Sequence, residues 1–105
     1  MQVAISETRA KRGFVTDPLK LHLLRSEEVG EVASELKRLW SESYGDFNRD
    51  RLKEEVADVF VLLAALATRF HIDIEQAVRE KFFQKDDTRD WKSAIDWSHT
   101  LCSCR

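Results

Sequence analysis

The stretch Val-Ala-Asp-Val-Phe-Val-Leu-Leu-Ala-Ala-Leu-Ala, residues 56–67, is apolar at every position except Asp58. A helix that is apolar nearly all round is expected to be buried. A carboxylate without a partner is costly there, because no apolar neighbour replaces the water that it loses. The run itself contains no histidine or arginine to pair with it. We therefore expect Asp58 to be protonated, paired from elsewhere in the chain, or bound to a cation.

Three other carboxylates share the spacing of a helix face with Asp58 or with each other. Glu55 precedes Asp58 by three residues, and Glu28 and Glu31 repeat that spacing in an earlier stretch. Residues three apart lie on one face of a helix. Two antiparallel neighbouring helices would therefore bring the two pairs together, with Glu31 about level with Asp58. Carboxylates without His or Cys favour a hard divalent cation, Mg²⁺ or Mn²⁺, so the pattern predicts a metal site.

The alternative interpretation of these acids is the solvated polar face of an amphipathic helix. Glu27 and Glu54 fit that interpretation better than metal ligation. Glu28, Glu31 and Glu55 fit it less well, because they adjoin apolar positions, and Asp58 fits it least.

Length and composition predict one all-α domain, residues 1–105. The chain has one proline and three glycines, too few for an all-β fold rich in turns. A net charge of -2 favours neither nucleic acid nor anionic lipid as a partner. No apolar run reaches the roughly 18 residues of a membrane span, and no leader is recognisable. Cys102 and Cys104 are too close together to staple a fold, so we expect a cytoplasmic protein.

Local signals divide the chain into helices. A short helix is expected over residues 1–11, with Gly13 ending it. Asp17 and Pro18 start a long helix that reaches about Trp40. Its apolar positions keep helical spacing: Leu21, Leu24, Val29, Val32, Leu36 and Leu39. Asn48 caps a second long helix over about 49–70, and a third is expected over about 74–89.

The short loop between the two long helices makes them antiparallel neighbours. The expected fold is a helical bundle built on this hairpin plus the third helix, and completed by oligomerisation. The core spans about residues 13–91, and 92–105 form a divergent tail. Such apolar helices leave more surface than one subunit covers, so a homodimer or a dimer of dimers is expected.

Basic residues follow one another at intervals of four in the third helix. Lys81, Lys85 and Arg89 would share a face and could contact phosphate groups. The alternative is a solvated charged face, because Glu80, Asp86 and Asp87 are interleaved with them.

Glu27-Glu28-Val29-Gly30-Glu31, 23 intervening residues and then Glu55-Val56-Ala57-Asp58 resemble the double motif of MazG-type nucleotide pyrophosphohydrolases. These belong to the all-α NTP pyrophosphatase superfamily, and the resemblance covers about residues 13–91. It implies that Glu28, Glu31, Glu55 and Asp58 hold Mg²⁺ ions that grip a nucleotide triphosphate. Water then attacks the α-phosphorus, giving a nucleoside monophosphate and pyrophosphate.

The resemblance also implies roles outside the four ligands. Glu27 would orient or deprotonate the attacking water, and Lys81 and Arg89 would contact phosphates. The chain departs from its relatives at Lys85-Asp86-Asp87, where many carry an asparagine. The expected activity is hydrolysis of nucleoside or deoxynucleoside triphosphates in nucleotide-pool housekeeping. Two alternatives stay open: a phosphoribosyl-ATP pyrophosphatase, and a non-catalytic helical dimerisation module.

Overall fold

The computed structural model describes residues 1–85, and all the regular structure in that range is helical, as the sequence predicts. The elements are α1 (Gln2–Lys11), α2 (Pro18–Trp40), the 3₁₀ turn η1 (Glu42–Tyr44), α3 (Arg49–Arg69), α4 (Ile74–Val78) and the π-helical segment η2 (Arg79–Lys85). None of these helices is long and apolar enough to cross a membrane. The chain forms two compact units, Met1–Ile74 and a second that begins at Glu75.

The two long helices begin at the predicted capping residues. Asp17 accepts a hydrogen bond from the amide of Lys20 at 3.0 Å, and Pro18 occupies the first helical position. Asn48 Oδ1 accepts from the amides of Asp50 and Arg51 at 2.9 and 3.2 Å. These side chains satisfy amides that have no partner inside the helix. The predicted starts of α2 and α3 are therefore confirmed.

The end of α3 is closed by a left-handed residue. His71 has a φ of 56°, and its amide donates to the carbonyl of Thr68 at 3.0 Å. The amide of Ile72 donates back to the carbonyl of Ala67 at 2.9 Å. This pair of bonds is the Schellman motif, which satisfies carbonyls at a helix C-terminus. The predicted short connection after residue 70 is thus confirmed.

The third helix differs from the continuous α-helix expected over 74–89. It is α-helical only over Ile74–Val78 and continues as the π-helix Arg79–Lys85. Residues 86–89 lie outside the described part. Hydrogen bonds to the fifth residue widen each turn of a π-helix, so residues four apart are less well aligned than in an α-helix.

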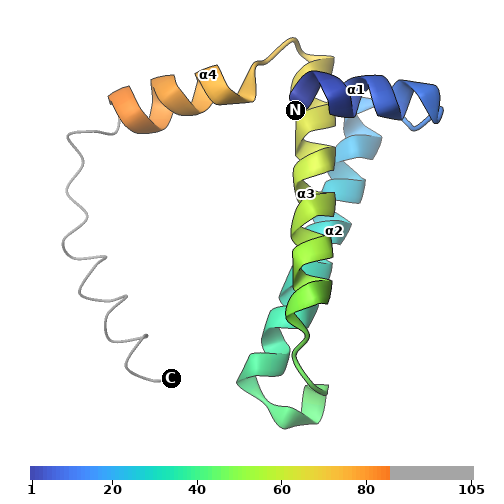
Figure 1. Ribbon diagram of the computed structural model, residues 1–105, viewed down its shortest axis with the longest axis vertical. Coiled ribbons are helices and arrows are strands. Elements are labelled where there is room, and N and C mark those ends of the chain that lie inside the picture. The colour runs from blue at the N-terminus through green and yellow to red at the C-terminus, as the bar shows by residue number, and fades with distance from the viewer. Residues whose placement is uncertain (86–105) are drawn as a thin grey trace. The chain divides into compact units, whose positions relative to one another are not determined.

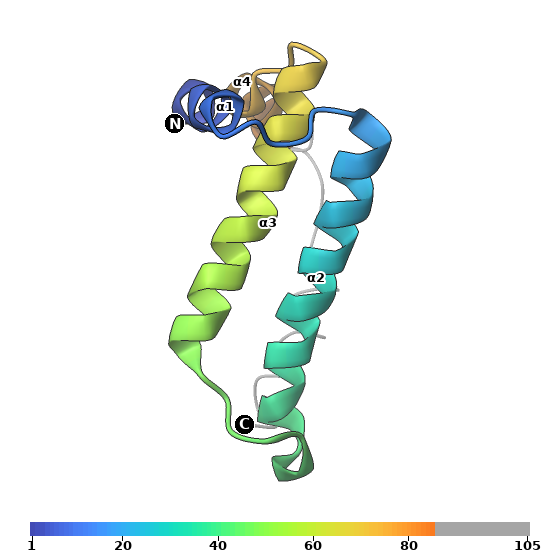
Figure 2. The ribbon, with the colours of Figure 1, turned by 90° about the vertical axis from the view of Figure 1, so that its right-hand side faces the viewer.

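Helices α2 and α3 run side by side in opposite directions, and α1 packs against the C-terminal end of α3 (Figures 1 and 2). Only four apolar residues of the described part are buried: Leu21, Leu62, Ala64 and Ala67. The expectation that residues 56–67 are buried all round is wrong for the single chain, because Val56, Phe60 and Leu63 remain exposed. A two-helix hairpin covers only one stripe of each helix.

The covered stripe of α2 is unusually charged. Its buried and half-buried positions follow helical spacing: Pro18, Leu21, Arg25, Glu28, Val32, Glu35 and Arg38. The apolar positions Leu24, Val29, Leu36 and Leu39 are instead 40 to 66% exposed. The inner face of the hairpin is therefore built for polar contacts, while much of the apolar surface faces outward.

Gln2 ties α1 to the far end of α3. Its Nε2 donates to Thr68 Oγ1 at 3.1 Å and to the carbonyl of Ile72 at 2.6 Å. Its Oε1 accepts from the amide of Ile74 at 3.0 Å, which supplies a partner for the first amide of α4. No local pattern in the sequence indicates these contacts, because they span 66 to 72 residues.

We expect Gln2→Ala to lower the free energy of unfolding by about 1–3 kcal/mol, because it removes three hydrogen bonds and leaves part-buried groups unpaired. Urea titration followed by circular dichroism measures the change. The exposed Gln84 in η2 provides a matched control, and Gln84→Ala should leave the midpoint within error. Equal midpoints for the two variants would contradict the role assigned to Gln2.

Candidate active site

A buried glutamate joins the C-terminal half of α2 to the start of α3. Glu35 is 2% exposed and accepts the amide of Asn48 at 2.8 Å. It also forms ion pairs with Arg51 at 3.2 Å and Arg38 at 3.4 Å. Since Asn48 is the N-cap of α3, this contact anchors that helix where it begins. The sequence analysis missed Glu35, although it stands seven residues after Glu28 and so on the same face.

The contacts of Glu35 place the middle of the C-terminal half of α2 beside the start of α3, because this carboxylate meets both the amide of Asn48 and the side chain of Arg51. The last turn of α2 therefore extends past the start of α3. Counted along both helices from these two contacts, Glu31 lies level with residues 52–55 of α3 and Glu28 with residues 55–58. The contacts do not support the predicted register, with Glu31 opposite Asp58.

The four predicted ligands differ in how exposed they are to solvent. Glu28 and Glu55 are half-buried, and the Oε2 atom of each is buried without a hydrogen-bond partner among residues 1–85. Glu31 and Asp58 are exposed. The expectation that Asp58 is buried is therefore wrong for the single chain, and the cost of a buried charge gives no support to ligation by this residue. The cost of burying a carboxylate without a partner applies instead to Glu28 and Glu55.

Burial and neighbouring negative charges both act on the carboxyl group of Glu28. Burial raises its pKa above the ordinary value of 4.5, and a hydrogen bond to Glu31 raises it further. The charges of Glu31, Asp58 and Glu27 act in the same direction. A neighbouring anion disfavours a second one, so protonation relieves this crowding. The contribution from Asp58 also indicates that acids from both helices lie near one another.

These residues fit a divalent cation in their chemistry. Within the described residues, no three Asp, Glu, His or Cys side chains are gathered closely enough to hold a metal ion. Two buried carboxylate oxygens without partners nevertheless require a donor or a cation, and the crowded charges favour a cation. Glu31 and Asp58 are exposed, so packing does not fix their orientation. Turning toward Glu28 and Glu55 would complete an oxygen-only ligand set.

Three of the remaining predicted site residues are exposed in the described part of the chain. Glu27 is exposed on α2 beside Glu28. Lys81 and Lys85 are exposed in η2, which belongs to the second unit. The π-helical geometry of η2 weakens the argument that residues four apart share a face. Arg89, like the tail 92–105, lies outside the described residues.

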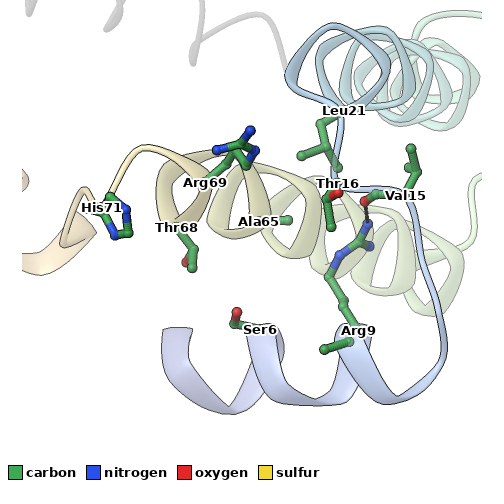
Figure 3. Close-up of a pocket in the computed structure, with 10 residues that line it drawn as sticks. Ser6, Arg9, Val15, Thr16, Leu21, Ala65, Thr68, Arg69 and His71 are labelled. Carbon is green, nitrogen blue, oxygen red and sulfur yellow. Dashed lines mark hydrogen bonds between the residues drawn. The ribbon is translucent and has the colours of Figure 1, made fainter.

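A cavity of about 290 Å³ lies at the end of the hairpin farthest from its loop. Figure 3 shows Ser6 and Arg9 reaching it from α1, and Ala65 and Thr68 from α3. Arg9 Nη2 donates to the carbonyl of Val15 at 2.9 Å. The other lining residues are Ala10, Thr16, Leu21, Arg69 and His71. Basic and hydroxyl groups alternate with apolar walls, which suits a small polar ligand.

The cavity and the acids share one side of the hairpin. Leu21 lines the cavity and lies seven residues before Glu28, and Ala65 lies seven after Asp58. Seven residues are about two turns, or roughly 10 Å along the helix axis. The acids and the cavity are therefore about two turns apart along the same face of each helix.

Comparison with protein families identifies one match. The model of the MazG nucleotide pyrophosphohydrolase domain matches residues 17–92, which include both acid pairs. Searches of curated proteins and of solved structures each returned no significant match. Because the family model covers most of the chain, the protein belongs to the MazG nucleotide pyrophosphohydrolase domain family.

Proposed function

We propose that the protein hydrolyses nucleoside or deoxynucleoside triphosphates at the bond between the α- and β-phosphorus, releasing a monophosphate and pyrophosphate. Membership of the MazG family carries this proposal, because the matched residues include all four acids. The charge crowding at Glu28 supports it, since a folded protein gains nothing from such a cluster without a cation.

In this proposal Glu28, Glu31, Glu55 and Asp58 hold Mg²⁺, with Mn²⁺ as a possible substitute. The bound ions would lower the pKa of water and neutralise charge on the departing pyrophosphate. Glu27 is exposed beside the ligands and would accept the proton of the attacking water. Lys81, Lys85 and Arg89 would contact phosphate oxygens as charge-assisted hydrogen-bond donors.

We assign the nucleoside end of the substrate to the cavity beside α1. Its distance from the acids, roughly 10 Å along the helices, is compatible with a ligand that spans both sites. Thr68, Ser6 and Thr16 offer hydroxyl groups to a sugar or base, and Leu21 and Ala65 offer apolar contact.

The decisive experiment incubates the protein with a panel of nucleoside triphosphates, with and without Mg²⁺, and assays pyrophosphate and orthophosphate separately. The proposal expects pyrophosphate only, Mg²⁺ dependence, and loss of product in Asp58→Asn. Glu42→Gln in the exposed turn η1 is the control that should keep full activity. Release of orthophosphate, or equal activity in Asp58→Asn, would contradict the proposal. Activity confined to phosphoribosyl-ATP would assign the chain to that reaction instead.

The outward apolar surface supports assembly with a second copy. On α3 the exposed side chains of Val56, Phe60 and Leu63 follow helical spacing, and on α2 Leu19 and Leu23 do the same. Exposed stripes of this kind mark interaction surfaces in soluble proteins. A homodimer, or a dimer of dimers, would bury them.

We therefore expect Phe60→Glu to shift the protein to a smaller species, because a charge in an apolar contact loses its hydration. Sedimentation velocity at several concentrations measures the shift. Lys53→Glu changes an exposed residue of the same helix and should leave the assembly intact. A wild-type chain that sediments as a monomer at all concentrations would exclude this assembly.

A further inference from the structure

Arg25 is a basic residue on the covered stripe of α2, and the other, Arg38, pairs with Glu35. Arg25 is half-buried and stands between Leu21, which lines the cavity, and Glu28 of the acid group. Residues four and three apart lie on one helix face, so the three positions form a row along α2.

The guanidinium of Arg25 is only partly satisfied. Its Nη2 lies 3.0 Å from His22 Nδ1, while its Nε is buried without a hydrogen-bond partner within residues 1–85. No carboxylate in that range forms an ion pair with it. Side chains on a helix lean toward its N-terminus, which agrees with the contact to His22. The guanidinium therefore lies on the cavity side of Glu28.

Residues 1–85 contain four buried side-chain atoms without partners, and three of them are complementary to one ligand. The fourth, Arg38 Nε, belongs to the guanidinium that pairs with Glu35. Glu28 Oε2 and Glu55 Oε2 require a cation or a proton donor, and Arg25 Nε requires an acceptor. A phosphate chain that carries a divalent cation supplies both. Arginine is well suited to the acceptor side, because its planar donors match phosphate oxygens and it keeps its charge.

We propose that Arg25 binds a phosphate of the nucleotide on the cavity side of the acid group. The assignment rests on the function proposed above and adds the direction in which the substrate lies. The phosphate nearest the sugar contacts Arg25, the pyrophosphate end extends past Glu28, and the nucleoside enters the cavity beside α1. Arg25 thereby distinguishes the two ends of the triphosphate, which the four carboxylates alone do not.

The test compares Arg25→Gln and Arg25→Lys with Lys20→Gln, which removes the same charge from an exposed position of the same helix. The probe is a nucleoside triphosphate with an imido group between the α- and β-phosphorus, added with Mg²⁺ and measured by calorimetry. We expect its affinity to fall roughly 10- to 100-fold in Arg25→Gln, less in Arg25→Lys, and not at all in Lys20→Gln. The melting-temperature shift caused by Mg²⁺ alone should be the same in all of them.

Several results would overturn the assignment. Wild-type affinity in Arg25→Gln shows that no phosphate contact is lost. If Arg25→Gln loses the melting-temperature shift caused by Mg²⁺ alone, the substitution disturbs the four acids in general. If Arg25→Gln sediments as a smaller species than the wild type, Arg25 lies at a subunit contact. If the wild type and Arg25→Gln both bind the probe and both release pyrophosphate from a nucleoside triphosphate, the proposed function stands without Arg25. A wild-type protein that does neither overturns both.

Discussion

Glu28→Gln should abolish pyrophosphate release and yet raise the melting temperature of the metal-free protein. Glu28 would ligate the metal, so its loss should lower turnover by at least about 100-fold. Its raised pKa means that the folded chain disfavours the charged carboxylate relative to the unfolded chain. Glutamine removes that penalty at neutral pH. Opposite effects on activity and stability are typical of a residue kept for function.

The same substitution has a pH signature. The folded protein holds the Glu28 proton more tightly than the unfolded chain, so stability falls as pH rises from 4.5 through the raised pKa. Thermal melts in a chelating buffer should show this decline for the wild type and a smaller one for Glu28→Gln. Mg²⁺ should raise the wild-type melting temperature, because it binds the folded site, and should do so less in the variant. Glu42→Gln should match the wild type. Identical pH profiles for wild type and Glu28→Gln would refute the electrostatic account.

Glu35→Ala should cause a large loss of stability in the hairpin. It removes the acceptor of the Asn48 amide and the partner of Arg51, at a side chain that is 2% exposed. A cost of about 2–3 kcal/mol follows, mainly from the amide left unpaired, since Arg51 is half exposed and can be hydrated. Urea unfolding measures it, and Glu7→Ala on α1 is an exposed control.

Glu35→Ala should also need more Mg²⁺ for half-maximal activity, because α3 would lose the contact that holds Glu55 and Asp58 beside α2. Glu35→Gln can still accept the amide hydrogen bond, so its effects should be intermediate. A stable Glu35→Ala protein with wild-type Mg²⁺ dependence would show that the register is fixed elsewhere.

Local chemistry made the helices predictable. Asp17, Pro18 and Asn48 act within one turn of their own positions, so the starts of α2 and α3 could be inferred from sequence. The level of α3 against α2 could not, because it depends on where Asn48 meets Glu35, thirteen residues away. An error of one turn in that contact changes which acids are level.

Burial was harder to predict than helix formation. The hydrophobicity of residues 56–67 indicates that water is excluded, but not whether a neighbouring helix or another chain excludes it. Arg25 and Glu35 show the converse difficulty. Each is a charged residue on the covered side of α2, where an average pattern predicts apolar residues, and only the position of α3 reveals their surroundings.

The small number of enclosed apolar side chains has a thermodynamic consequence. A chain that shelters only four of them within its described part gains little from hydrophobic burial while it is alone. Most of that gain would arise when another surface covers Val56, Phe60 and Leu63. Folding and association would then be one equilibrium, and mass action would make the unfolding temperature rise with protein concentration.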